Sequence, residues 1–293
     1  MNAPDPSDKT FGAAVCLVGS PNAGKSTLLN RILDKKVSVV SDKPQTTRTR
    51  ILGILTRKPH QLIFIDTPGI GKPIRDHGTR LNRIAEEAGF EADIVLFLLD
   101  AKKGIGDNDR NILKRLKKLD KPVVAVINKM DLTSNEKVMP VAMMLHEEWG
   151  IADIFPISAK LGFNVESLIV KLCELAPENP FLYGEHEKTT QTNEQIVSEY
   201  VREQIFINSD KELPYSVLIR MERFEETPEA IIAEATLLVE HTRHRRILIG
   251  EKGAFIANLR RNAVRRLKQY FSRPVKLALW VKVQHPSRGS NFS

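Results

Sequence analysis

The sequence is poor in cysteine and lacks long apolar runs. Its two cysteines, Cys16 and Cys173, lie among aliphatic residues, where a small buried thiol is the usual occupant, so neither a disulfide framework nor a cysteine-rich metal site is expected. No stretch approaches the roughly 18 consecutive apolar residues of a membrane-spanning helix. The opening residues, MNAPDPSDKT, lack the basic and apolar parts of a signal peptide. We therefore expect a cytoplasmic protein.

Acidic residues are nearly absent from one end of the chain. Residues 241–293 contain thirteen Lys or Arg and one acid, Glu251, which gives a net charge of +12, whereas the first 240 residues carry −4. A positive excess confined to one end favours a polyanion such as nucleic acid as the partner of that end. An anionic membrane surface is a second partner that such a segment can bind.

The length of 293 residues exceeds what one compact core usually spans, so two domains are expected. A segment with scattered prolines, glycine and charges separates two runs of predicted strands and helices. We expect a disordered lead-in at 1–10, a nucleotide-binding domain at 11–176, a linker at 177–192, a second domain at 193–285 and a flexible tail at 286–293.

A phosphate-binding loop is predicted at residues 19–26, GSPNAGKS, between an apolar strand and the start of a helix. The segment fits GxxxxGK[ST], in which loop amides and the helix N-terminus hold phosphates; a chance glycine turn is the alternative. Lys25 supplies charge to the outer phosphates, and the Ser26 hydroxyl is placed to bind Mg²⁺. The expected nucleotide contacts are Gly19, Ser20, Pro21, Asn22, Ala23, Gly24, Lys25, Ser26 and Thr27.

Two later segments carry the residues expected to respond to the third phosphate. Residues 36–50 have little apolar periodicity and contain Thr46 and Thr47, either of which is a candidate Mg²⁺ ligand; a solvated loop without a metal role is the alternative. The next core strand leads into DTPG, where Asp66 can reach Mg²⁺ through water and the Gly69 amide can contact the terminal phosphate. The expected nucleotide contacts here are Asp66, Thr67, Pro68, Gly69 and Ile70.

The sequence Asn128-Lys129-Met130-Asp131 follows another predicted strand and is expected to select the base. Guanine presents two adjacent N–H donors that one carboxylate accepts, whereas adenine would leave an oxygen of Asp131 unpaired at a cost of roughly 1–3 kcal/mol. A loop after the last strand suits a backbone amide directed at the guanine carbonyl oxygen. GTP is therefore predicted over ATP, with contacts from Asn128, Lys129, Met130, Asp131, Ser158, Ala159 and Lys160.

The pattern of strands and helices predicts an α/β protein. Strands and helices alternate from residue 11 to 175, which is typical of a P-loop NTPase domain with a mostly parallel sheet and ligands at the strand ends. The later order is helix, strand, strand, helix, helix, strand, with a GxxG loop at 250–253 between two helices. This order matches a smaller α+β type II K homology (KH) domain, whose loop clamps the backbone of about four nucleotides; simple helix capping by the glycines is the alternative. The candidate RNA contacts are Arg243, Arg245, Arg246, Ile249, Gly250, Glu251, Lys252 and Gly253.

The motifs GSPNAGKS, QTTR, DTPGI, NKMD and ISAK together resemble the translation-factor-type P-loop GTPases, and most closely the Era branch. LPYSV, RFEE, IGEKG and LWVKV resemble the C-terminal domain of the same family, so the resemblance covers the whole chain. It implies hydrolysis of GTP to GDP and phosphate. It also implies binding of small-subunit ribosomal RNA near its 3′ end and a role in assembly of the 30S-type subunit. The resemblance also implies that Ser26 and one threonine of QTTR bind Mg²⁺ and that Asp66 supports the ion through water.

Two positions bear on the rate of hydrolysis. Ile70 stands where Ras-like enzymes place a glutamine that orients the attacking water, so slow intrinsic turnover is expected. Asn22 resembles the asparagine with which related bacterial enzymes hold K⁺ in place of an arginine finger; shaping the loop is its alternative role. The predicted catalytic set is Asn22, Lys25, Thr46, Thr47, Asp66 and Gly69, with Mg²⁺ as the cofactor and K⁺ as a further candidate.

Three other functions are compatible with parts of the pattern. Asp131 disfavours an ATP-driven RNA remodeller. A GTP-dependent signalling or cell-cycle switch that recruits protein partners is compatible with slow turnover. Another GTPase of the same branch is disfavoured because a GxxG module, rather than a helical domain or a second phosphate loop, follows the first domain. A monomer is expected, and the resemblance implies partial peripheral association with the inner face of the cell membrane.

Overall fold

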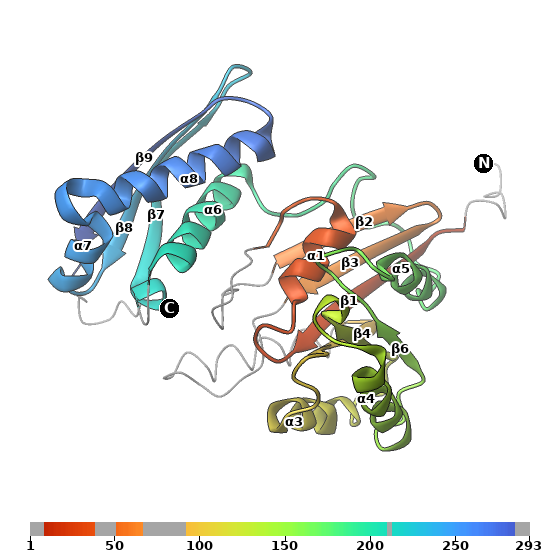
Figure 1. Ribbon diagram of the computed structural model, residues 1–293. Coiled ribbons are helices and arrows are strands. Elements are labelled where there is room, and N and C mark those ends of the chain that lie inside the picture. The colour runs from red at the N-terminus through yellow and green to blue at the C-terminus, as the bar shows by residue number, and fades with distance from the viewer. Residues whose placement is uncertain (1–8, 39–50, 67–91, 210–212, 285–293) are drawn as a thin grey trace, which may run out of the picture. The chain divides into compact units, whose positions relative to one another are not determined.

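The computed structural model describes residues 9–38, 51–66, 92–209 and 213–284. The chain divides into two compact units, Met1–Thr190 and Gln191–Ser293. Each unit has a sheet of its own (Figure 1). Their apolar cores are separate as well, with one buried cluster on each face of the first sheet and one cluster in the second unit.

The first unit is built on a six-stranded sheet. Its strands are β1 (Phe11–Gly19), β2 (Ile51–Arg57), β3 (His60–Asp66), β4 (Ile94–Asp100), β5 (Val123–Asn128) and β6 (Asp153–Pro156). They lie in the order β2-β3-β1-β4-β5-β6, and all neighbours are parallel except β2 and β3. This mostly parallel sheet confirms the fold class predicted for the first domain.

Helices cover both faces of this sheet. They are α1 (Lys25–Leu33) and α5 (Val165–Glu174) on one face, and α3 (Asp107–Leu116) and α4 (Asn135–Glu147) on the other. Because alternate side chains of a strand point to opposite faces, Val15 and Leu17 of β1 pack with α1 and α5, while Cys16 and Val18 pack with α3 and α4. β4 is buried along its whole length, as expected of a parallel strand covered on both faces.

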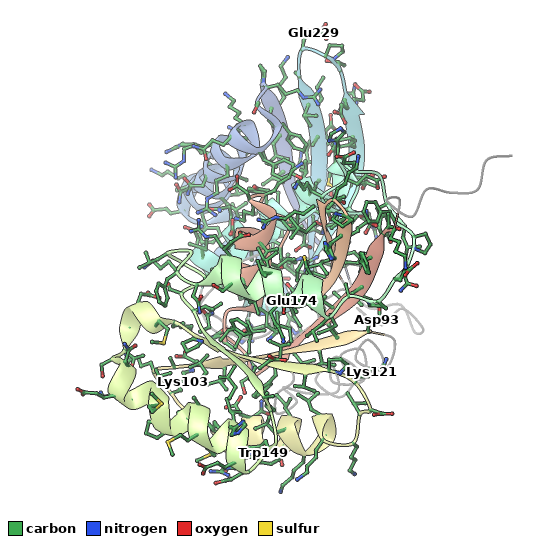
Figure 2. All side chains as sticks on the ribbon, turned by 90° about the vertical axis from the view of Figure 1, so that its right-hand side faces the viewer. Asp93, Lys103, Lys121, Trp149, Glu174 and Glu229 are labelled. Atoms are coloured by element: carbon green, nitrogen blue, oxygen red, sulfur yellow. The ribbon has the colours of Figure 1, made fainter. Side chains whose placement is uncertain are left out.

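The parallel strands bring the predicted nucleotide motifs to one edge of the sheet. The phosphate loop follows the end of β1, and the base motif begins at the last residue of β5. Asp93 and Lys121 lie at the opposite edge, where β4 and β5 begin, and Lys103 lies beyond the carboxyl end of β4 (Figure 2). The ligand motifs therefore meet at the carboxyl ends of the strands, which is where such sheets bind ligands.

The segment predicted as a linker, 177–192, pairs with the first sheet for most of its length. The backbone N–H of Ile54 in β2 donates to the carbonyl of Lys188 at 2.9 Å. The Gln61 side chain is 1% exposed and bonds the backbone of Tyr183 through both its nitrogen (2.8 Å) and its oxygen (3.1 Å). A buried amide with its hydrogen bonds made fixes the chain that it contacts. This segment is thus attached to the first unit up to the division after Thr190.

The second unit has the predicted order of helix, strand, strand, helix, helix, strand. Its elements are α6 (Asn193–Asn208), β7 (Val217–Glu226), β8 (Ile231–Val239), α7 (Thr242–Ile249), α8 (Ala254–Phe271) and β9 (Val275–Val283). β7 and β8 are antiparallel, whereas β8 and β9 are parallel. The element order and the smaller sheet agree with the KH-type domain that was predicted.

Helices α6, α7 and α8 contribute to the core of the second unit together with its sheet. Glu203 of α6 is 2% exposed and forms an ion pair with Arg266 of α8. A buried carboxylate needs such a partner, so Arg266 has a structural role and does not add to a free basic surface. Across the described ranges no helix is both long enough and apolar enough to cross a membrane.

Candidate nucleotide site and RNA-binding loop

Lys25 lies inside the phosphate loop. Its Nζ donates to the carbonyls of Gly19 (3.0 Å) and Ser20 (3.2 Å), and the residue is 7% exposed. Burial lowers the pKa of Lys25 to about 8, although the carboxylates of Asp66 and Asp109 act in the opposite direction. The lysine charge and the N-terminus of α1 are therefore directed at the same loop, as phosphate binding requires.

The lowered pKa of Lys25 gives nucleotide binding a measurable pH response. Phosphate oxygens favour the ammonium form, so binding should raise the Lys25 pKa from about 8 and take up a proton where the free lysine is neutral. We expect GDP binding at about pH 8.5 to take up most of one proton, and GDP affinity to fall as the pH rises further. Calorimetry in two buffers with different ionisation enthalpies measures the uptake. Identical enthalpies in both buffers at that pH would contradict the prediction.

Asp66 is fully buried at the end of β3 and has one oxygen without a partner. Its Oδ2 accepts hydrogen bonds from the hydroxyls of Ser26 (2.9 Å) and Ser38 (2.7 Å). Its Oδ1 has no hydrogen-bond partner in the described part of the chain. Burial raises the pKa of Asp66, against the lowering effects of Ser38 and Lys25. A buried carboxylate oxygen beside a serine hydroxyl fits a hard cation such as Mg²⁺.

The other residues predicted to respond to the third phosphate lie outside the described residues. They are Thr46, Thr47, Thr67, Pro68, Gly69 and Ile70. Their roles stay predictions. The sequence pattern did not single out Ser38, yet its hydroxyl, like that of Ser26, donates a hydrogen bond to Asp66. No local motif marks Ser38, because its partner lies 28 residues further along the chain.

The base motif joins two loops that are far apart in sequence. The Asn128 side chain is 2% exposed; its Nδ2 donates to the Ala23 carbonyl (2.8 Å), and its Oδ1 accepts from the Ala159 amide (3.0 Å). Asp131 Oδ1 accepts from the Ser158 hydroxyl at 2.6 Å. The structure thus brings together the phosphate loop and the two segments predicted to read guanine.

Lys129 and Ser20 have partners that the sequence pattern did not indicate. Lys129 Nζ pairs with Asp100 at the end of β4, at 2.7 Å. The Ser20 hydroxyl donates to Asp109 Oδ1 (2.5 Å) at the start of α3, and Asn108 Nδ2 donates to that hydroxyl (2.8 Å). These contacts tie the phosphate loop and the base motif to the strand and helix that lie between them in sequence.

The remaining predicted contacts also lie at this edge of the sheet. Asn22 has φ +66°, a left-handed conformation that asparagine tolerates better than most residues. Thr27 lies in the first turn of α1, and Met130 opens a 3₁₀ turn that ends at Leu132. The backbone carbonyls of Ala159 and Lys160 both accept from Arg31, a residue of α1 that the sequence pattern did not single out.

The GxxG loop lies between α7 and α8, as predicted. Gly250 and Gly253 have φ values of +73° and +82°, in the left-handed region that favours glycine. A Cβ at Gly250 would lie 2.6 Å from the Cβ of Phe255, whereas a Cβ at Gly253 would meet nothing within 4 Å. Gly250 is therefore needed for packing, while Gly253 leaves an open approach to the backbone beside the exposed Lys252.

Arginines on α7 form an exposed basic face beside this loop. Arg243, Arg245 and Arg246 are exposed, whereas His244 and Leu248 of the same helix are buried. The periodicity of a helix places the two buried residues on one side, four positions apart. The basic residues near the loop are therefore available to a polyanion. Ile249 and Glu251 flank Gly250, and Glu251 is exposed.

Together the fold and the two sites define a class, the P-loop GTPases that carry a KH module. The family model for 50S ribosome-binding GTPases matches residues 14–129, and the KH domain model matches residues 212–288. GTPase Era from Caldanaerobacter subterraneus subsp. tengcongensis is 38% identical over 272 residues, which cover 92% of this chain and 91% of that relative. The chain therefore belongs to the Era family and is a GTP hydrolase with an RNA-binding KH domain.

Other relatives match over nearly the whole chain. GTPase Era from Clostridium kluyveri is 38% identical over 278 residues, covering 94% of this chain and 95% of that relative. A crystal structure of Aquifex aeolicus Era bound to GDP·AlF₄⁻ matches with a TM-score of 0.89 and 34% identity, covering 94% and 95%. A crystal structure of Era with MgGDPNP and nucleotides 1506–1542 of 16S ribosomal RNA has the same TM-score and identity, covering 94% of each chain. The resemblance inferred from the motifs is thereby confirmed.

Proposed function

We propose that this protein uses GTP binding and hydrolysis to regulate its binding of small-subunit ribosomal RNA near the 3′ end, during assembly of the 30S-type subunit. The observation that carries the proposal is that one chain joins the segments predicted to read guanine at one edge of the sheet and also has an open GxxG loop. The solved Era complex that holds MgGDPNP and a 16S fragment supports the pairing of these two ligands.

In the proposed nucleotide site, Lys25 and the backbone amides of residues 22–26 bind the phosphates. Ser26, Asp66 and one of the two threonines, Thr46 or Thr47, would hold Mg²⁺. When bound, Mg²⁺ supplies positive charge that stabilises the phosphate oxygens during hydrolysis. Asp66 contributes as a carboxylate, and binding of a cation favours that ionised form despite the burial that raises its pKa. With Ile70 in place of a glutamine, slow intrinsic turnover is part of the proposal.

Asn22 is the proposed ligand of K⁺. Its left-handed φ of +66° also supports the alternative, in which the side chain only shapes the loop. Asn22→Gly separates the two roles, because glycine adopts this conformation without carrying an amide oxygen. The test measures GTP turnover in K⁺ and in Na⁺ for the unmutated protein and for Asn22→Gly. Loss of a K⁺ advantage in Asn22→Gly supports the ligand role, and an unchanged ratio of the two rates supports the loop-shaping role.

The proposed setting is the cytoplasm, where GTP, GDP and ribosomal RNA are the partners of a monomer. Peripheral contact with the inner face of the cell membrane is a further proposal, supported by the basic C-terminal part of the chain. A signalling switch that recruits proteins is the competing function. GDP release measured with and without a 16S 3′-end fragment distinguishes the two functions. The proposed function requires the RNA fragment to change nucleotide binding, whereas a signalling switch that recruits proteins does not.

Gly253→Asp is expected to weaken RNA binding at least tenfold and to leave intrinsic GTP turnover unchanged. The added carboxylate would stand in the open approach to the loop and repel the phosphate backbone, a charge effect of a few kcal/mol at most. RNA crosslinking in cells and binding of a 16S 3′-end fragment at modest salt measure the effect.

Gly150→Asp is the matched control for this experiment. Gly150 has φ +69° and nothing within 4 Å of its Cβ position, so the backbone strain and the charge change are similar, but the residue lies in the first unit. Equal weakening of RNA binding by the two substitutions would refute the role of the loop. Gly250→Asp is a poorer test, because its Cβ would disturb the packing of Phe255.

A further inference from the structure

One arginine of the phosphate-loop helix reaches the loop predicted to read guanine. Arg31 lies in the last turn of α1, and its Nε donates to the carbonyl of Ala159 at 3.1 Å. Its guanidinium also donates to the carbonyl of Lys160. The partners are 128 and 129 residues away in sequence. A planar guanidinium that bonds two successive carbonyls fixes the orientation of the backbone between them.

The remaining hydrogen bonds of this loop leave one amide available. The Ala159 amide donates to Asn128, and the Ser158 amide donates to the Phe163 carbonyl. The amides of residues 161 and 162 donate to the side chain and the carbonyl of Ser158. Within the described part of the chain, the Lys160 amide is the member of this run without an acceptor. It is therefore the donor left for a ligand.

Arg31 holds the peptide group to which this amide belongs. The carbonyl of Ala159 and the N–H of Lys160 are parts of one planar trans peptide, so they point in opposite directions. When Arg31 binds the carbonyl from one side, the N–H is directed away on the other. The positive guanidinium also polarises the peptide, which makes its N–H a better donor.

We propose that Arg31 is a positioning residue for base recognition and that it orients the Lys160 N–H toward the 6-carbonyl oxygen of guanine. The inference rests on the proposed nucleotide site and assigns a specific donor within it. Asp131 reads the N1–H and the 2-amino group, while Arg31 acts through Lys160 on the opposite side of the same edge. Because α1 begins at the phosphate loop, its first turn would contact the phosphates while Arg31 in its last turn positions the loop that contacts the base.

The test compares three nucleotides with the full-length protein. GDP carries the 6-carbonyl oxygen, 6-thio-GDP replaces it with sulfur, a weak acceptor, and IDP keeps the oxygen but lacks the 2-amino group. Arg31→Ala is expected to weaken GDP binding about tenfold, as for loss of a charge-assisted hydrogen bond, with at most a twofold effect on 6-thio-GDP. The ratio of GDP to IDP affinity should not change, and Arg31→Lys should restore part of the GDP affinity.

Arg57→Ala is the control, because Arg57 pairs with Glu166 in the same unit and leaves the two carbonyls untouched. Equal weakening of GDP and 6-thio-GDP by Arg31→Ala would overturn the inference while leaving the proposed base site intact. If the unmutated protein binds GDP no better than 6-thio-GDP, the donor assignment itself fails. If it also binds ATP as well as GTP, the proposed nucleotide site fails with it.

Discussion

Asp131→Asn is expected to reduce GTP affinity about a thousandfold and to create affinity for xanthosine triphosphate. A carboxylate accepts from both N–H groups on the guanine edge, whereas an amide has one acceptor and turns an NH₂ donor toward a base donor. Sites built around a hydrogen bond reject the mismatched ligand by factors of this order or larger. Xanthine carries a carbonyl at position 2 and so matches the amide. Displacement of a fluorescent guanine nucleotide by each triphosphate measures the change.

Asp131→Ala provides the comparison, because it removes the acceptor without adding a donor. Asp131→Ala should lose affinity for GTP and should gain no affinity for xanthosine triphosphate. Asp131 Oδ1 accepts a hydrogen bond from the Ser158 hydroxyl at 2.6 Å, and both substitutions remove or weaken that bond. Any effect of the bond on the position of the Ser158 loop is therefore shared by the two variants. GTP affinity within a few-fold of normal in Asp131→Asn would show that this residue does not select the base.

Gly24→Ala is expected to lower GTP affinity and turnover by at least a hundredfold. Gly24 has φ +102°, and a Cβ there would lie 2.1 Å from Nδ2 of Asn128. That nitrogen donates to the Ala23 carbonyl, and the same side chain accepts from the Ala159 amide, so its displacement would disturb both loops. Moving a binding group by about 1 Å can cost a hundredfold in rate. Single-turnover GTP hydrolysis and GDP binding measure the effect.

Gly104→Ala is the matched control. Gly104 also has a positive φ, +67°, but nothing lies within 4 Å of its Cβ position. We expect a loss of roughly 1 kcal/mol in the free energy of unfolding from backbone strain and unchanged nucleotide binding. If Gly24→Ala and Gly104→Ala lower GTP affinity alike, the cause is general strain and not the contact with Asn128.

Most of the fold could be predicted because its signals are local. Apolar runs such as the one in β4 and the helical spacing in α3 are set by nearby residues, and the structure has strands and helices where these patterns occur. The order of helices and strands in the KH domain was predicted in the same way, because each helix or strand has its own local sequence pattern. For 177–192, scattered prolines and glycine indicated a linker, but Lys188 and Thr189 within it bond β2 through contacts more than 100 residues apart in sequence.

The sequence by itself determined the ligand chemistry, because GSPNAGKS, NKMD and the GxxG loop are short peptides whose backbone shape and functional groups come from adjacent residues. Only the tertiary structure decided which groups support them. Ser38 bonds Asp66, Ser20 bonds Asp109, and Arg31 bonds the carbonyls of Ala159 and Lys160. Those pairs lie up to 129 residues apart, and a hydrogen bond of about 3 Å across that separation exists only once the sheet has brought the strand ends together.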